Sequence, residues 1–347
     1  MPEIINLTVH TNTIVRILLL GFLGFSLSML ITPIYTNLAF KHQWWKKPRE
    51  KATTGEVAKV FNKLHASKHS RHIPTMAGVI FVVATIIITL VFNLERTETW
   101  LPLAAFTGAG LVGLLDDLIN IRGSGKGVAG LPSKLKLMLI TFIALVGGLW
   151  FYFKLDVASV SVPFVDSPLA LGWLVVPLFV LVVVSTANAV NISDGLDGLA
   201  GGLATSAFAS YAVIALLQQR YGIAAFCMTI VGGLLSYTWF NIHPARFFMG
   251  DVGSFALGTA LGVVAMLTNT VFILPIIGLL FVVEAGSSMI QILSKKLRNG
   301  KKIFKIAPIH HHFEASGWEE TKVTMRFWVI GQVTGVIGLI VYLLGGR

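Results

Sequence analysis

The hydrophobic positions of this chain gather into long runs that short polar segments separate. A run of about 20 apolar residues is long enough to cross a bilayer as a helix. We expect ten transmembrane helices, at about 14–40, 74–93, 101–116, 135–153, 171–188, 199–218, 223–240, 252–268, 272–294 and 326–344. Pro275 and Gly278 predict a bend in the ninth. The pattern predicts an all-α polytopic membrane protein in which residues 1–347 form one domain.

The polar segments differ in charge, and this sets the expected orientation. Of the 27 Lys and Arg residues, 22 fall in alternate segments, starting with the one after the first run. Basic loops stay in the cytoplasm, so both termini are expected to be extracytoplasmic. The expected cytoplasmic loops are about 41–73, 117–134, 188–199, 241–251 and 295–325. The net charge of +11 indicates anionic lipid or phosphate substrates rather than nucleic acid, because aromatic residues do not interleave with the basic ones.

Two smaller patterns concern packing. The alternation from Val157 to Val165 predicts a small extracytoplasmic β-hairpin. Glycine pairs with GxxxG spacing, at Gly258/Gly262 and Gly331/Gly335, favour close helix packing within the chain, and a homodimer contact is the alternative.

The acidic residues are few, and they gather at the cytoplasmic ends of the runs. A charge at the centre of a membrane helix costs about 2.5–3.5 kcal/mol on insertion scales, so a cluster at one face indicates a site. Asp116 and Asp117 end the third run, with solvated helix-end charges as the alternative. Polar residues then recur at every third position from Asn188 through Asn191 and Asp194 to Asp197, which places them along one side of a helical path.

Two later loops extend this set. Asp251 stands between glycines just before the eighth run, following Asn241. Carboxylate and amide oxygens suit Mg²⁺ better than Zn²⁺, while a helix N-cap is the alternative for Asp251. His310, His311 and His312 follow Pro308, and consecutive histidines cannot all face one metal in a regular helix. We therefore expect these three histidines to donate hydrogen bonds to a diphosphate rather than to bind a metal.

One acid lies inside a run. Glu284 is expected within the ninth helix, and an acid at that depth is either functional or a polar contact between helices. The sequence favours neither interpretation over the other.

Four of these motifs together resemble one enzyme family. Asp116-Asp117, Asn188 to Gly198, Phe248 to Ser254 and Pro308 to Glu314 are similar to motifs of the polyprenyl-phosphate N-acetylhexosamine-1-phosphate transferases. The stretch from the His triplet to Trp318 resembles the branch that transfers phospho-MurNAc-pentapeptide. One departure is Asn120, which stands where the family usually has lysine.

The resemblance implies a Mg²⁺-dependent enzyme of the bacterial inner membrane with its active site facing the cytoplasm. Its substrates would be UDP-MurNAc-pentapeptide and undecaprenyl phosphate, and its products lipid I and UMP, in peptidoglycan synthesis. Asp251 resembles the metal ligand, and Asp116, Asp117 and the His triplet resemble catalytic residues. The implied substrate-binding residues are Asn188, Asn191, Asp194, Gly195, Leu196, Asp197, Asn241, Phe248, Gln291 and Lys136. The alternatives are a sister transferase that uses UDP-GlcNAc and, in another class, a cation or solute transporter.

Overall fold

The computed structural model describes residues 11–45, 72–123 and 130–345, and most of this part of the chain is helical. Most of the expected cytoplasmic loop at about 41–73 lies outside the described residues. The helices are α1 (Thr11–Lys41), α4 (Gly78–Phe92), α5 (Trp100–Arg122), α6 (Ser133–Phe153), α7 (Val175–Ser193), α8 (Leu199–Leu217), α9 (Tyr221–Asn241), α10 (Gly250–Leu267), α11 (Leu274–Ile277), α12 (Leu279–Leu297), α13 (Ile309–Glu314) and α14 (Glu320–Gly345), with a 3₁₀ turn, η1, at Gly172–Leu174.

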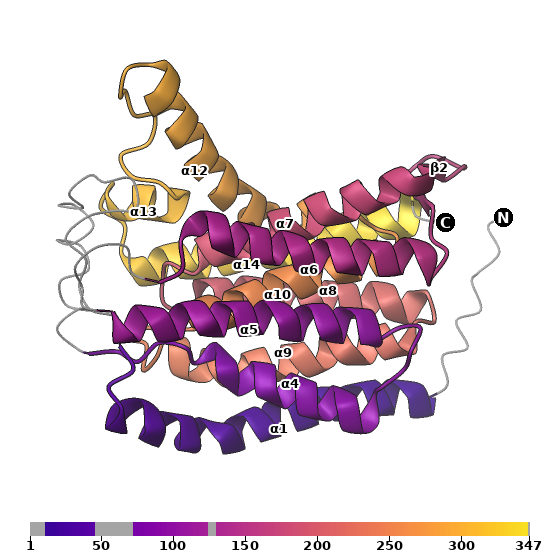
Figure 1. Ribbon diagram of the computed structural model, residues 1–347, viewed down its shortest axis with the longest axis horizontal. Helices are drawn as coiled ribbons and strands as arrows, with labels where there is room; N and C mark the ends of the chain where they lie inside the picture. Colours follow the sequence, from indigo (N-terminus) through magenta and orange to yellow (C-terminus); the bar gives the residue numbers. More distant parts are fainter. Residues whose placement is uncertain (1–10, 46–71, 124–129, 346–347) are drawn as a thin grey trace.

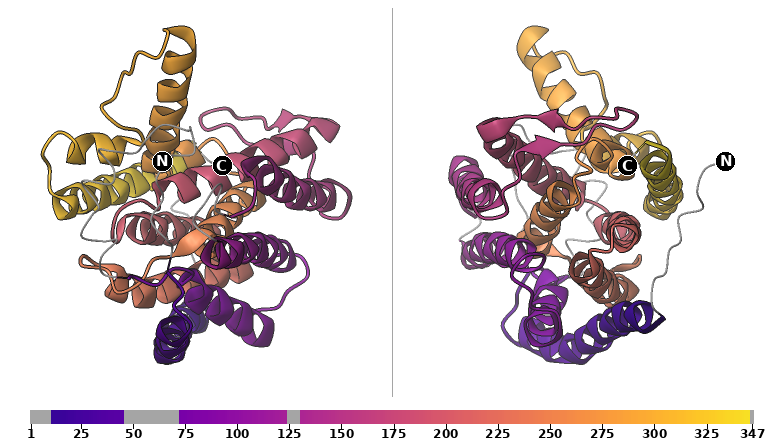
Figure 2. Two further views of the ribbon diagram at one scale, coloured as in Figure 1. Left: turned by 60° about the vertical axis from the view of Figure 1, so that its left-hand side comes forward. Right: turned by 90° about the vertical axis from the view of Figure 1, so that its right-hand side faces the viewer.

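Most of the long helices lie side by side along one direction (Figure 1) and are seen nearly end-on in Figure 2. Within the described residues, eight helices are long and apolar enough to cross a membrane. The other two expected spans fall on α4, which has 15 residues, and on the pair α11 and α12. The all-α membrane fold is therefore confirmed, and the count of ten stays a prediction.

The ninth run is broken, as its proline and glycine predicted. α11 ends before Gly278 and α12 begins after it. Glycine has a low preference for helix interiors because its backbone loses the most freedom there. Beyond this break, α12 leaves the bundle and projects away from it, with α13 beside it at the same end of the molecule (Figure 1).

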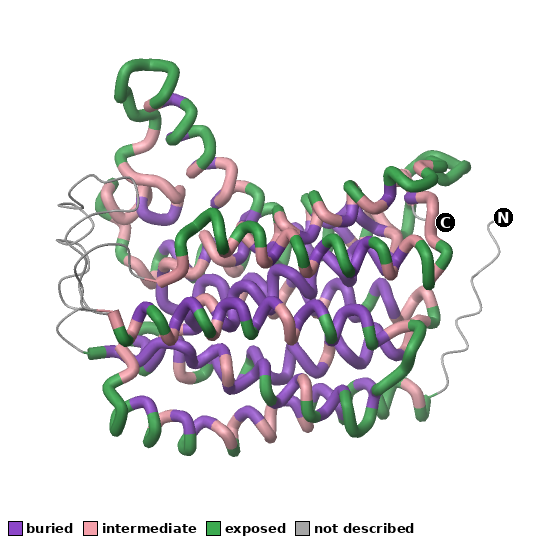
Figure 3. Tube along the Cα trace, in the orientation of Figure 1, coloured by how far each residue is buried: buried purple, intermediate pink, exposed green. Residues whose placement is uncertain are grey.

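Helix α10 forms the centre of the bundle, and the purple trace in Figure 3 marks this buried core. Small residues let its neighbours approach closely. A side chain at Gly113 of α5 would collide with the backbone of α10, and side chains at Gly258 and Gly262 would collide with α7. The other glycine pair packs α14 against α8. Both pairs therefore serve contacts within the chain, and a homodimer stays a prediction.

The expected hairpin is present at one end of the bundle. Strand β1 (Ser159–Val160) pairs with β2 (Leu169–Ala170) in antiparallel register, so the second strand lies beyond the alternating segment that predicted it. The Phe164 N–H donates a hydrogen bond to the Gly345 carbonyl at 3.0 Å. The N-terminal end of α1 and the C-terminal end of α14 lie at this same end of the bundle (Figure 1). Their side of the membrane stays a prediction.

Candidate active site

Three carboxylates meet at the end of the bundle away from the hairpin. Asp116 and Asp117 come from the last two turns of α5, and Asp251 comes from the first turn of α10. One oxygen of each lies within 4.8 Å of the others. Successive residues on a helix point about 100° apart, so the two α5 carboxylates approach Asp251 from different directions. We call these three residues the acidic centre.

Backbone donors hold two of these carboxylates in place. The Leu131 N–H donates to Oδ1 of Asp116 at 2.6 Å, and the Val252 N–H donates to Oδ2 of Asp117 at 3.1 Å. Both side chains are buried. Charge-assisted hydrogen bonds of this kind are stronger than neutral ones, which offsets part of the cost of burying the charges.

Lys136 and Asn191 complete the acidic centre from two further helices. The Lys136 Nζ, on α6, lies 3.0 Å from Oδ2 of Asp251 and 3.4 Å from Oδ2 of Asp116. The amide of Asn191, on α7, lies 3.3 Å from Oδ1 of Asp251 and donates to Oγ of Ser254 at 2.9 Å. The sequence proposed all five of these residues, the acidic centre with Lys136 and Asn191, as parts of one site, and the structure brings them together.

The oxygens of the acidic centre suit a magnesium ion. Mg²⁺ takes oxygen ligands and is commonly held by one or two carboxylates together with substrate phosphates. Three carboxylates against the single lysine amine leave an excess of negative charge, which a divalent cation would offset. We infer that Asp251 would hold the ion, with Asp116 and Asp117 close by.

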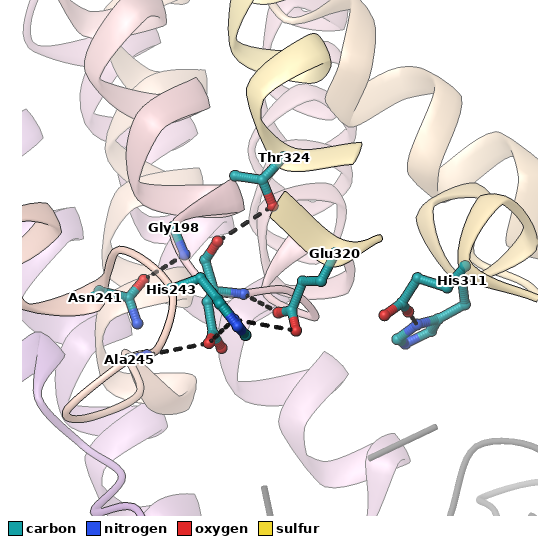
Figure 4. A network of polar contacts seen from close by, with 9 residues as sticks. Gly198, Asn241, His243, Ala245, His311, Glu320 and Thr324 are labelled. Carbon is teal, nitrogen blue, oxygen red and sulfur yellow. Dashed lines mark hydrogen bonds and ion pairs between the residues drawn. The ribbon is translucent and has the colours of Figure 1, made fainter. Parts of the chain in front are cut away.

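A second polar network ties the turn between α7 and α8 to two other segments (Figure 4). Oδ2 of Asp197 lies 2.9 Å from Nδ1 of His243 and accepts the Ala245 N–H at 3.1 Å. The carboxylate of Glu320, at the start of α14, accepts the Asp197 N–H at 2.7 Å and lies 3.5 Å from His243. Asp197, His243 and Glu320 offer a second set of possible metal ligands, but their oxygens already accept N–H donors, so this set fits a structural network.

The same turn is pinned along its backbone. Asn241 accepts the Gly198 N–H at 2.9 Å and donates to the Phe247 carbonyl at 2.8 Å. Thr324 and Trp328 of α14 donate to the carbonyls of Asp197 and Gly198. Gly198 adopts φ +77, a conformation that glycine tolerates without strain.

Sequence reasoning missed His243 and Glu320. His243 stands two residues after Asn241, and Glu320 closely follows the segment that marks the muramoyl branch. Their positions next to motif residues were the available signal. What the sequence could not show was that three loops far apart in the chain meet at Asp197.

The three histidines lie at the base of α12 and make different contacts. Nδ1 of His310 lies 2.8 Å from Oε2 of Glu284, and Nδ1 of His311 lies 2.6 Å from Oε2 of Glu314. His312 accepts the Lys305 N–H at 3.1 Å through Nδ1. Burial and the neighbouring His310 lower the pKa of His311, while Glu314 raises it.

The remaining predicted site residues have mixed surroundings. Asn188 donates back to the Val184 carbonyl of its own helix. Gln291 holds the loop after α12, since its amide pairs with the backbones of Ile303 and Phe304. Asp194 ends α7, Leu196 packs in the core, and Phe248 is half-buried between backbone hydrogen bonds. Their contacts with substrate stay predictions.

Comparison with known proteins gives a consistent result. Residues 99–269 match the family model "Glycosyl transferase family 4", which covers α5 through α10 and thus the acidic centre. A protein of Chloroflexus aurantiacus, a phospho-N-acetylmuramoyl-pentapeptide-transferase, is 36% identical over 344 residues, 95% of this chain and 90% of the relative. One of Listeria monocytogenes with the same name is 39% identical over 283 residues, 80% of this chain and 86% of the relative.

This chain belongs to the phospho-N-acetylmuramoyl-pentapeptide transferase family. It is therefore an enzyme, a phosphoglycosyl transferase, and a multi-pass bacterial membrane protein. The resemblance that the motifs predicted is confirmed, including its muramoyl branch. The family model ends at residue 269, before Glu284 and the His triplet.

Proposed function

We propose that this enzyme catalyses Mg²⁺-dependent transfer of phospho-MurNAc-pentapeptide from UDP-MurNAc-pentapeptide to undecaprenyl phosphate. The products are lipid I and UMP, at a membrane step of peptidoglycan synthesis. The observation that carries the proposal is the acidic centre, in which three carboxylates, a lysine and an amide from four helices converge at one end of an apolar bundle. The donor sugar is proposed from the similar proteins, which are phospho-N-acetylmuramoyl-pentapeptide-transferases.

The chemistry asks the site to bring two anions together. An oxygen of the lipid phosphate attacks the β-phosphorus of the donor, a new P–O bond forms, and the bond to the UMP oxygen breaks. A Mg²⁺ ion held by Asp251 would offset negative charge on the donor diphosphate. The Lys136 ammonium adds a fixed positive charge beside Asp116 and Asp251. Fixed charges aimed at the reacting atoms need no reorganisation during the reaction.

Asp116 is best suited to position the lipid phosphate. Because a phosphate monoester has its second pKa near 6, the nucleophile is already ionised at neutral pH and a strong base is not required. Asp117 lies deeper, bonded to the α10 backbone, and would hold the two helices in register at the reacting centre.

The donor would lie between the α7–α8 turn and the His triplet. The Asp194-to-Asp197 turn, Phe248 and Gln291 are proposed as nucleoside and phosphate contacts. Asn241 supports the turn by accepting the Gly198 N–H. His310 to His312 would lie near the diphosphate. The active site would face the cytoplasm of the inner membrane, where the nucleotide donor is available.

A reconstituted assay tests the proposal. Purified protein should release UMP from UDP-MurNAc-pentapeptide when undecaprenyl phosphate and Mg²⁺ are present. Chelation should stop the release, and added Mg²⁺ should restore it. The sister branch is tested in parallel with UDP-GlcNAc. Release of UMP from UDP-GlcNAc alone would show that the enzyme belongs with the sister transferases that use this donor. No release from either donor would overturn the proposed reaction.

A further inference from the structure

Glu284 and His310 form a buried pair that links α12 to α13. Both side chains are essentially without solvent exposure, and Oε2 of Glu284 lies 2.8 Å from Nδ1 of His310. A buried carboxylate is costly unless a partner compensates it. The pair joins the element that projects from the bundle to the short helix carrying the His triplet, so Glu284 is not an isolated acid facing lipid.

The opposite edge of the His310 ring faces the α7–α8 turn. A side chain at Gly195 would collide with Nε2 of His310, so only glycine allows the ring to pack there. The imidazole is thus wedged between Glu284 on one side and the Asp194-to-Asp197 turn on the other. Rotation of the ring would lose the bond to Glu284.

The Nδ1 partners make the three consecutive histidines chemically different. His312 accepts a backbone N–H at Nδ1, so a neutral His312 carries its proton on Nε2. Nδ1 of His310 and of His311 each face a carboxyl group, and an ionised carboxylate favours a proton on the ring nitrogen that it faces. Their ring centroids are 4.1 Å apart, and two positive charges at that distance would repel each other.

We propose that Glu284 is a positioning residue for His310. Its carboxylate holds the imidazole ring with Nδ1–H toward α12 and Nε2 toward the α7–α8 turn, and its negative charge favours the protonated form of the ring. This inference rests on the proposed function, which places the donor diphosphate beside that turn. The titratable groups on the elements that meet at this ring are Glu284 on α12, His311 and Glu314 on α13, and Asp194 beside Gly195. Glu284 forms a hydrogen bond with Nδ1 of the His310 ring at 2.8 Å.

The substitution Glu284→Gln separates charge from shape. Glutamine fills the same volume and its carbonyl can still accept the Nδ1–H, but it lacks the negative charge and its amide can also donate to Nδ1. We expect UMP release to fall about tenfold to a hundredfold, the loss that is typical when the partner that orients a metal-ligating histidine is removed. The limb of the pH–rate profile that reports His310 should move to lower pH, since loss of the carboxylate makes the imidazolium less favourable.

A double-mutant cycle distinguishes positioning from structural support. If Glu284 acts through His310, adding Glu284→Gln to a His310→Asn enzyme should cost little further rate, because the residue it acts on is already gone. Glu98→Gln is the matched control. That carboxylate accepts the Gly222 N–H at 2.6 Å at the hairpin end of the bundle, and its replacement should leave rate and pH profile unchanged.

Each outcome decides the inference. Every variant is first shown to be folded by its melting temperature and its elution in size-exclusion chromatography. A Glu284→Gln enzyme with the wild-type rate and profile would overturn it, and so would fully additive losses in the cycle. An unshifted profile together with a lowered melting temperature would show a purely structural link between α12 and α13. A wild-type enzyme that releases no UMP would instead contradict the proposed function.

Discussion

Asp251 is the residue on which the acidic centre converges, because Lys136 and Asn191 both contact its carboxylate. We expect Asp251→Asn to lose at least about a hundredfold in rate, since the amide keeps the shape but removes the charge that is proposed to hold Mg²⁺. Mg²⁺ should raise the melting temperature of the wild type by binding the folded state, and this shift should shrink in the variant. UMP release and thermal unfolding with and without Mg²⁺ measure both effects.

The matched control is Asp166→Asn, the same exchange at an exposed position in the loop between β1 and β2. It should change neither the rate nor the Mg²⁺-dependent shift in melting temperature. Undiminished turnover of Asp251→Asn at low Mg²⁺ would place the metal ligand elsewhere, with Asp116 and Asp117 as the next residues to substitute.

The acidic residues could be predicted as site residues from the sequence. A charged side chain is costly in a membrane-spanning chain, so its presence there indicates a functional site. Asp116, Asn191 and Asp251 come together as expected. Side chains whose meaning depends on a partner could not be predicted in the same way. Glu284 remained undecided between two interpretations until the structure showed His310 bonded to it.

At the scale of elements, the contact between α14 and the α7–α8 turn depends on Glu320. Its carboxylate accepts the Asp197 N–H at 2.7 Å, and Glu320→Ala would leave that donor without this acceptor. Such a loss costs about 1–2 kcal/mol, which corresponds to about a fivefold to thirtyfold change in an equilibrium constant. Because the α7–α8 turn is proposed to contact the donor, we expect the loss mainly as a higher KM for UDP-MurNAc-pentapeptide.

Glu319→Ala is the neighbouring control, since Glu319 is exposed and surface substitutions usually change stability by less than about 0.5 kcal/mol. Steady-state kinetics on both variants separate KM from kcat. A fall in kcat at unchanged KM for Glu320→Ala would show that the turn serves the reacting centre rather than donor binding.

Long apolar runs predicted the bundle helices because about 20 apolar residues have few other stable arrangements in a membrane protein. The short helix α13 could not be predicted in this way. It has six residues, too few for a periodic pattern, and tertiary contacts hold it. The hydrogen bond between His310 and Glu284 and the stacking of the Phe313 ring on Trp318, with centroids 4.8 Å apart, are two of these contacts.

The whole molecule is polarised along its long axis. The acidic centre and the His triplet lie toward one end of the bundle, and the β1–β2 hairpin lies at the other with the described ends of α1 and α14 (Figure 1). This one-sided arrangement is what an enzyme needs if its water-soluble donor arrives from one compartment and its lipid acceptor from the bilayer. A pathway across the membrane would instead require polar residues spread through its depth.

The side of the membrane on which the site lies follows from the basic loops and can be tested directly. Single cysteines are placed at Lys301, in the loop after α12, and at Ser167, in the hairpin loop, in a background where the buried Cys227 is changed to serine. We expect an impermeant thiol reagent to label Ser167→Cys in intact cells and Lys301→Cys only in inverted vesicles. Each variant is the control for the other, because both positions are exposed. Labelling of Lys301→Cys from outside would reverse the orientation and would place the acidic centre away from the cytoplasmic nucleotide, which contradicts the proposed donor.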